Sequence, residues 1–146
     1  MSNKVAVVVG GGSGMGAAAA RKLAQDGFQV VIGSRSGASV PGFDCVAIDV
    51  TSTQSVDDAF TLIETSWGIP EVLVCNAGIT KDALVLRMSD EDFEAVIDSN
   101  LTGAFRVAKR GTTTTTGDDG FFSITAVPGD TLKFRRFGFE EEQLWV

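Results

Sequence analysis

Residues 5–16 read VAVVVGGGSGMG, an apolar run that passes into a cluster of glycines. Every position of Val5–Val9 is apolar, which is typical of a strand buried on both faces of a parallel sheet. The alanine-rich stretch that follows predicts a helix from Gly14 to Asp26, with Gly27 as the residue that ends it. A strand that leads through glycines into a helix forms a cradle for phosphate. The missing Cβ atoms let an anion reach the backbone, and the first N–H groups of the helix face it.

Strands and helices alternate through most of the chain. Further buried strands are predicted at 29–32, 45–48 and 72–75. Thr53 is placed to cap a helix between the last two, and a longer helix is predicted to begin at Ser89. The apolar stripe of the longer helix consists of Phe93, Ile97, Leu101, Phe105 and Ala108. This alternation predicts an α/β fold whose parallel sheet is a truncated, Rossmann-like half with strand order 3-2-1-4.

The composition changes after residues 1–110. Five threonines at 112–116 are interpreted as a strand rather than a flexible linker, because threonine favours strands. Further short strands are predicted at 121–126, 131–136 and 143–146. We expect residues 111–146 to form an antiparallel β-meander that packs on the first segment and is not an independent domain, because so short a segment buries too little apolar surface to fold alone.

Composition excludes several classes of protein. The 146 residues suit one compact domain, and a net charge of −7 argues against nucleic acid as a partner. No apolar run is long enough for a membrane helix, so no membrane partner is expected. With two cysteines and no histidine the chain has neither a disulfide framework nor a tetrahedral zinc site, and we expect no metal and a cytoplasmic location. Both cysteines fall on predicted strands and are interpreted as small buried residues.

Four short motifs resemble those of the short-chain dehydrogenase/reductase family. Gly10-xxx-Gly14-x-Gly16 is similar to its TGxxxGxG pattern, with Val9 in place of the threonine. Asp49-Val50 follows the third strand, and Asn76-Ala77-Gly78 follows the fourth, where the family has an NAG motif. Asn100 and Gly103 match its N-x-x-G segment. The resemblance covers residues 1–110 and implies a dinucleotide cofactor.

The resemblance assigns cofactor contacts to the glycine loop and to the turns that follow the later strands. The second strand ends in Gly33-Ser34-Arg35, with no carboxylate to bond a ribose 2′-hydroxyl and with a guanidinium that suits a 2′-phosphate. This pattern predicts NADP(H) rather than NAD(H). The predicted cofactor-binding residues are Gly10, Gly12, Ser13, Gly14, Met15, Gly16, Arg35, Asp49, Val50, Asn76, Ala77 and Gly78.

The catalytic part of the family pattern has no counterpart in this sequence. The family uses a serine on the fifth strand and a Tyr-xxx-Lys pair, and this chain contains no tyrosine. We therefore assign no catalytic residue and expect an inactive Rossmann remnant of oxidoreductase ancestry that binds NADP(H) or another nucleotide weakly. The alternative hypothesis is an artificial chimera with no biological activity.

The final segment resembles part of a carboxypeptidase-regulatory-like β-sandwich domain. The resemblance is carried by Asp119–Ile124, Val127–Leu132 and Phe137–Glu140. Two incomplete domains joined without a linker suggest an engineered or recombined chimera. A half sheet leaves the outer edge of its fourth strand open, and the tail is expected to cover it. A homodimer through the sheet edge or the tail is the other way to close that edge.

Overall fold

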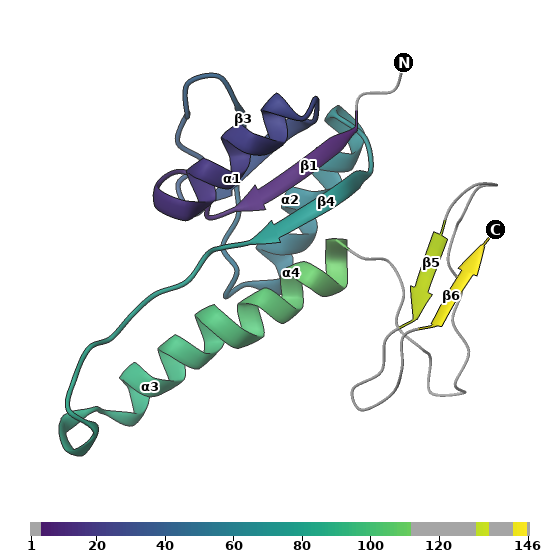
Figure 1. Ribbon diagram of the computed structural model, residues 1–146. Coiled ribbons are helices and arrows are strands. Elements are labelled where there is room, and N and C mark those ends of the chain that lie inside the picture. The colour runs from purple at the N-terminus through teal and green to yellow at the C-terminus, as the bar shows by residue number, and fades with distance from the viewer. Residues whose placement is uncertain (1–3, 112–130, 135–141, 146) are drawn as a thin grey trace. The chain divides into compact units, whose positions relative to one another are not determined.

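The computed structural model describes residues 4–111, 131–134 and 142–145 (Figure 1). The chain divides into two compact units, Met1–Thr112 and Thr113–Val146, each of which is described by itself. The first unit contains, in order, β1 (Val5–Val9), α1 (Gly14–Gln25), β2 (Gln29–Ser34), β3 (Asp44–Ala47), α2 (Thr53–Ser66), β4 (Pro70–Cys75), the 3₁₀ turn η1 (Val85–Arg87), α3 (Asp90–Ile97), the π-helical turn η2 (Asp98–Thr102) and α4 (Gly103–Gly111).

The four strands of the first unit form a parallel sheet in the order β3-β2-β1-β4. In the centre of the sheet Val7 pairs with Val31 of β2 on one side and with Leu73 of β4 on the other. This confirms the predicted α/β class and strand order. β2 and β4 are longer than predicted, since β2 continues to Ser34 and β4 begins at Pro70.

The sheet lies between two layers of helices, which explains why β1 is apolar at every position (Figure 1). Val5, Val7 and Val9 face a core built with residues of α2 and with Val107 of α4. Ala6 and Val8 face the opposite core, which includes Ala20 of α1. Alternate side chains of a strand point to opposite faces, so both sets must be apolar when both faces are covered.

Hydroxyl side chains cap the helices that follow β3 and β4. Ser89 caps α3 as predicted, and its Oγ accepts a hydrogen bond from the backbone N–H of Asp92 at 3.1 Å. The cap of α2 is Ser52 rather than the predicted Thr53, and its Oγ accepts from the N–H of Ser55 at 3.2 Å. Thr53 is the first residue of that helix.

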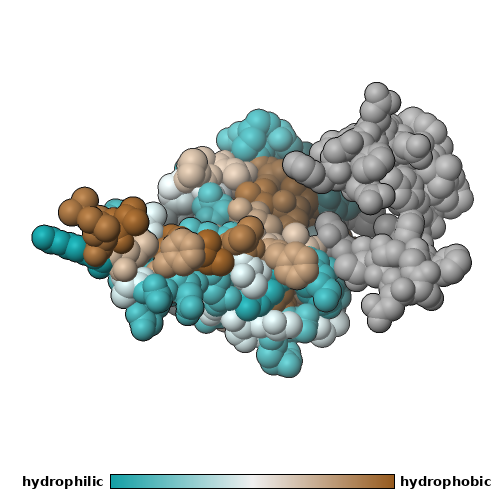
Figure 2. Space-filling model, turned by 90° about the horizontal axis from the view of Figure 1, so that it is seen from below, coloured by the Kyte–Doolittle hydropathy of each residue, from teal (hydrophilic) through white to brown (hydrophobic). Residues whose placement is uncertain are grey.

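The predicted long helix exists, but its buried face is not the one that the apolar stripe indicated. The stripe residues Phe93, Leu101 and Phe105 are 56%, 64% and 61% exposed. Ser99, Gly103 and Val107, which also recur every four residues, are buried. The helix approaches the loop after β3 closely at Val50, and small side chains mark the face where the two segments come near each other. Large apolar residues therefore line the open side (Figure 2).

Within the second unit the structure describes two strands, β5 (Thr131–Phe134) and β6 (Glu142–Trp145), which pair in antiparallel orientation. They fall within or beside two of the predicted strands. The predicted strands at 112–116 and 121–126, and most of the residues that resemble a β-sandwich domain, lie outside the described residues. The packing of residues 111–146 on the first segment stays a prediction. No helix in the described ranges is long and apolar enough to cross a membrane.

Candidate functional site

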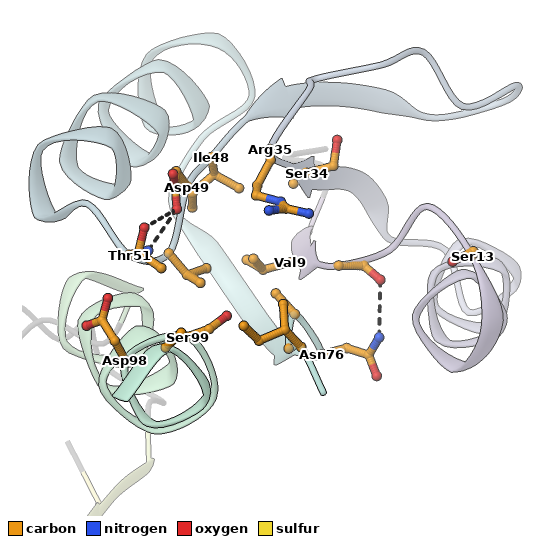
Figure 3. Close-up of a pocket in the computed structure, with 17 residues that line it drawn as sticks. Val9, Ser13, Ser34, Arg35, Ile48, Asp49, Thr51, Asn76, Asp98 and Ser99 are labelled. Carbon is orange, nitrogen blue, oxygen red and sulfur yellow. Dashed lines mark hydrogen bonds between the residues drawn. The ribbon is translucent and has the colours of Figure 1, made fainter. Parts of the chain in front are cut away.

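A pocket of roughly 510 Å³ opens at the carboxyl ends of the strands. The ends of β1, β2, β3 and β4 and the helical segment around η2 all contribute to its wall (Figure 3). In open parallel sheets this is the edge at which ligands bind, because the loops that leave neighbouring strands diverge there. The lining residues are Val9, Gly10, Ser13, Gly33, Ser34, Arg35, Ile48, Asp49, Val50, Thr51, Asn76, Ala77, Gly78, Ile79, Ala95, Asp98 and Ser99.

The glycine loop is held against the turn that follows β4. Asn76 donates from Nδ2 to the carbonyl oxygen of Gly10 at 3.1 Å, and its backbone N–H donates to the carbonyl of Val9 at 2.9 Å. A Cβ atom on Gly16 would lie 2.2 Å from the Gly10 oxygen, so only glycine fits there. Gly10 itself has φ +82°, a left-handed conformation that glycine adopts without strain. The start of α1 is thereby fixed next to the end of β1.

Charged groups are placed at the ends of β2 and β3. Arg35 is exposed and lines the pocket directly after β2. Asp49 accepts hydrogen bonds on Oδ1 from the Thr51 hydroxyl at 2.7 Å and from the Thr51 N–H at 2.9 Å. The Thr51 hydrogen bonds, helped by the positive charges of Arg35 and Arg106, lower the pKa of Asp49 below its ordinary value. Asp49 is therefore ionised at neutral pH, and its carboxylate offers acceptor positions to a ligand.

Asn100 fixes the segment that follows the Asn76-Ala77-Gly78 turn. Its Oδ1 accepts from the N–H of Ile79 at 2.8 Å, and its Nδ2 donates to the carbonyl of Ile79 at 2.9 Å. Asn100 is therefore a positioning residue, because its amide satisfies both backbone groups of Ile79, which lines the pocket.

Arg106 of α4 joins the helix to the loop after β3. Its Nη1 donates to the carbonyl oxygen of Val50 at 3.1 Å and to the Asp98 carboxylate at 2.9 Å. A Cβ on Gly103 would lie 2.8 Å from a side-chain carbon of Val50, so the helix and the loop are as close as glycine permits. These contacts bring Asp98 and Ser99 of η2 to the wall of the pocket.

The pocket gathers eight of the twelve residues that the sequence assigned to the cofactor: Gly10, Ser13, Arg35, Asp49, Val50, Asn76, Ala77 and Gly78. Gly12, Gly14, Met15 and Gly16 do not line it. Gly16 is buried under the loop, whereas the other three are exposed. Sequence reasoning missed Thr51, Ile79, Asp98 and Ser99 as lining residues. The described residues contain no group of three or more side chains suited to hold a metal ion.

Comparison with known families explains this combination of sheet, glycine loop and pocket. The profile of the short chain dehydrogenase family matches residues 4–120, which is most of the chain. The chain belongs to the short chain dehydrogenase family. The match extends beyond residue 110, where the sequence had suggested that the family resemblance ends. Neither the β-sandwich resemblance of the tail nor a chimeric origin finds support among the comparisons.

Several curated relatives of this short chain dehydrogenase are named reductases. It is 49% identical over 104 residues to the 3-oxoacyl-[acyl-carrier-protein] reductase MabA of Mycobacterium tuberculosis, covering 71% of this chain and 42% of that protein. It is 38% identical over 124 residues to the acetoacetyl-CoA reductase of Cupriavidus necator, covering 75% of the chain and 50% of the relative. The 3-oxoacyl-[acyl-carrier-protein] reductase FabG of Escherichia coli is 34% identical over 117 residues, covering 73% and 47%.

A solved structure shares the fold. The ligand-free aldohexose dehydrogenase of Thermoplasma acidophilum superposes with a TM-score of 0.71 at 30% identity, over 75% of this chain and 43% of that one. The chain thus spans half or less of the length of these relatives.

These relatives correct the prediction of an inactive remnant. That prediction rested on the absent Tyr-xxx-Lys pair, but the chain matches under half of most of its relatives, so the absence of a motif carries no conclusion about activity. The matched proteins are themselves named reductases. The alternative of an artificial chimera without activity is likewise not favoured, because one family accounts for residues 4–120.

Proposed function

We propose that the chain binds NADP(H) in the pocket at the carboxyl ends of its strands and serves the reduction of a 3-oxoacyl thioester. The observation that carries the cofactor assignment is Arg35, which lies at the end of β2 on the wall of the pocket. The names of the most similar relatives support the substrate class, since they act on 3-oxoacyl groups carried by acyl carrier protein or coenzyme A.

The residues present fit a dinucleotide phosphate. The backbone of the loop from Gly10 to Gly16 and the amino end of α1 suit the diphosphate, and a Cβ at Gly12 would meet nothing within 4 Å, so the outer side of the loop is open. Arg35 suits the 2′-phosphate, because a guanidinium pairs with phosphate in a bidentate manner. Asp49 and Val50 then lie beside the adenosine end.

NADPH, when bound, would supply the hydride for the 3-keto carbon, and a proton taken up by the keto oxygen completes the hydroxyl. The chain's own contribution is to hold and orient the cofactor. Asn76 fixes the glycine loop, and Asn100 fixes Ile79 on the wall of the same pocket. Such positioning matters because hydride transfer requires the reacting atoms to be held in close and defined contact.

Isothermal titration with NADPH and NADH tests the cofactor assignment. We expect NADPH to bind about tenfold more tightly than NADH, a difference of ~1.4 kcal/mol. Arg35→Asp should reverse the preference, because a carboxylate repels the 2′-phosphate. Arg21→Asp changes the net charge equally at an exposed position of α1 that does not line the pocket, and should leave the preference unchanged. Equal binding of both dinucleotides, or an equal effect of both variants, would refute the role of Arg35.

Turnover tests the substrate class. NADPH absorbance should fall when acetoacetyl-CoA is added, whereas glucose with NADP⁺ should give no change. The opposite result would favour sugar oxidation, the reaction named for the aldohexose dehydrogenase that shares the fold. A homodimer and a cytoplasmic location stay predictions, to be checked by sedimentation and by fractionation.

A further inference from the structure

Ser99 is the one buried polar side chain in the part of the chain that the structure describes. It is 6% exposed and lines the pocket from η2. Its hydroxyl forms no hydrogen bond with another described residue. Among these residues, every side-chain oxygen or nitrogen that is fully inaccessible to solvent has a hydrogen-bond partner. The Ser99 oxygen therefore reaches the surface of the cavity. Figure 3 shows it directed into the pocket, while the carboxylate of the neighbouring Asp98 points the other way.

A buried hydroxyl without a partner is unusual, because most buried polar side-chain atoms in native proteins are hydrogen-bonded. No hydrogen bond joins the Ser99 hydroxyl to another described residue, and its side chain lines the cavity. A hydroxyl can donate one hydrogen bond and can also accept, so it suits a ligand that presents either an acceptor or a donor. The position thus points to a ligand atom as the missing partner.

The contacts of Arg106 identify the end of the pocket at which Ser99 lies. Arg106 holds the Asp98 carboxylate and the Val50 carbonyl with the same Nη1 atom, so η2 is tied to the loop that carries Asp49. Gly103 brings the same helix against Val50. Ser99 therefore faces the β3 side of the pocket, which the proposed function assigns to the adenosine end of the dinucleotide. The adenosine end offers the ring nitrogens and the amino group of the purine there, besides its ribose oxygens and the 2′-phosphate that Arg35 addresses.

We propose that the Ser99 hydroxyl forms a hydrogen bond with the purine base of the bound dinucleotide and so contributes to recognition of its adenosine end. The inference rests on the proposed function, since it takes the ligand of the pocket to be NADP(H). It adds a contact that neither the glycine loop nor Arg35 provides, because those groups address phosphates. Ser99→Ala is the suitable probe, since it removes the hydroxyl and keeps the small volume that the close helix requires.

The experiment measures the dissociation constants of two ligands for the full chain and for its Ser99→Ala variant. Adenosine 2′,5′-bisphosphate carries the base, whereas inorganic pyrophosphate, titrated up to millimolar concentration in competition with NADPH, offers phosphate groups without a base. We expect Ser99→Ala to weaken the bisphosphate by about 3- to 10-fold, as for one hydrogen bond. Pyrophosphate binding should stay within about twofold of the original chain, since no base is involved. Ser66→Ala, at an exposed position near the end of α2, is the matched control and should change neither.

Three outcomes decide between the alternatives. If Ser99→Ala binds the bisphosphate as tightly as the original chain, the hydroxyl makes no contact and the inference is wrong. If the variant loses both ligands equally and also unfolds at lower temperature, Ser99 supports the pocket rather than the base, and the inference is again wrong. If the original chain binds neither adenosine 2′,5′-bisphosphate nor NADPH, the proposed function itself fails.

Discussion

Replacing Gly16 by alanine should destabilise the first unit although alanine is the better helix former. The added Cβ would lie 2.2 Å from the Gly10 oxygen and 2.8 Å from Asn76 Nδ2. Neither atom sits on a long side chain that can move aside. Overpacking of this kind costs about 1–3 kcal/mol. Loss of the Asn76–Gly10 hydrogen bond would destabilise the unit by about 1 kcal/mol more. The higher helix propensity of alanine offsets about 1 kcal/mol of this loss.

The expected net loss in the free energy of unfolding is about 2 kcal/mol, which corresponds to a fall of about 1 M in the urea midpoint. Urea denaturation followed by far-UV circular dichroism measures it. Gly12→Ala is the matched control in the same loop, because a Cβ there meets nothing within 4 Å. Its free energy of unfolding should change by no more than about 0.5 kcal/mol. An unchanged midpoint for Gly16→Ala, or equal losses for both variants, would show that the loop does not pack against the turn after β4.

Two further predictions concern α4 and β4. Arg106→Met should weaken binding of adenosine 2′,5′-bisphosphate about fivefold, roughly the effect of losing one hydrogen bond to the ligand. Arg110→Met, on the same helix as Arg106, breaks the ion pair with Glu64 of α2 and should leave binding unchanged in the same titration. Equal effects of the two variants would mean that Arg106 acts only on stability. Partial desolvation raises the pKa of the Cys75 thiol, so its thiolate fraction at neutral pH is lower than that of a free cysteine. In a Cys45→Ser background, which leaves Cys75 as the single thiol, alkylation by iodoacetamide should therefore be slow at neutral pH and keep rising above the ordinary thiol pKa of ~8.5. A plateau below that pH would contradict this assignment.

Sequence periodicity was sufficient for the sheet because its central strands, β1 and β2, are buried on both faces. Val5–Val9 has no polar position, and this single fact indicates a central parallel strand covered by helices on each side. The glycine loop and Arg35 were also visible, since their chemistry depends on residue type and on position after a strand. Cys75, in contrast, was predicted to be buried and is exposed, because β4 is an edge of the described sheet.

The helix after β4 shows where sequence reasoning fails. Two sets of residues recur every four positions. The apolar stripe predicts that the more hydrophobic set, which includes Phe93 and Leu101, is the buried one. The buried set contains Ser99 and Gly103, whose small size permits contact with Val50. Hydrophobicity does not report how closely two backbones approach, so the pocket residues Asp98 and Ser99 could not be placed from the sequence.

The π-helical turn η2 has a consequence for how this helix tolerates insertions and deletions. A π turn holds one residue more than a regular α-helical turn, and such turns are frequent at functional sites. Deleting one residue from η2 would restore an uninterrupted α-helix with regular bonding. It would also rotate everything after it by about 100° around the helix axis. Gly103 and Arg106 would then turn away from Val50. The extra residue therefore determines how the part of the helix that contacts the loop after β3 is rotated about the helix axis relative to the N-terminal part.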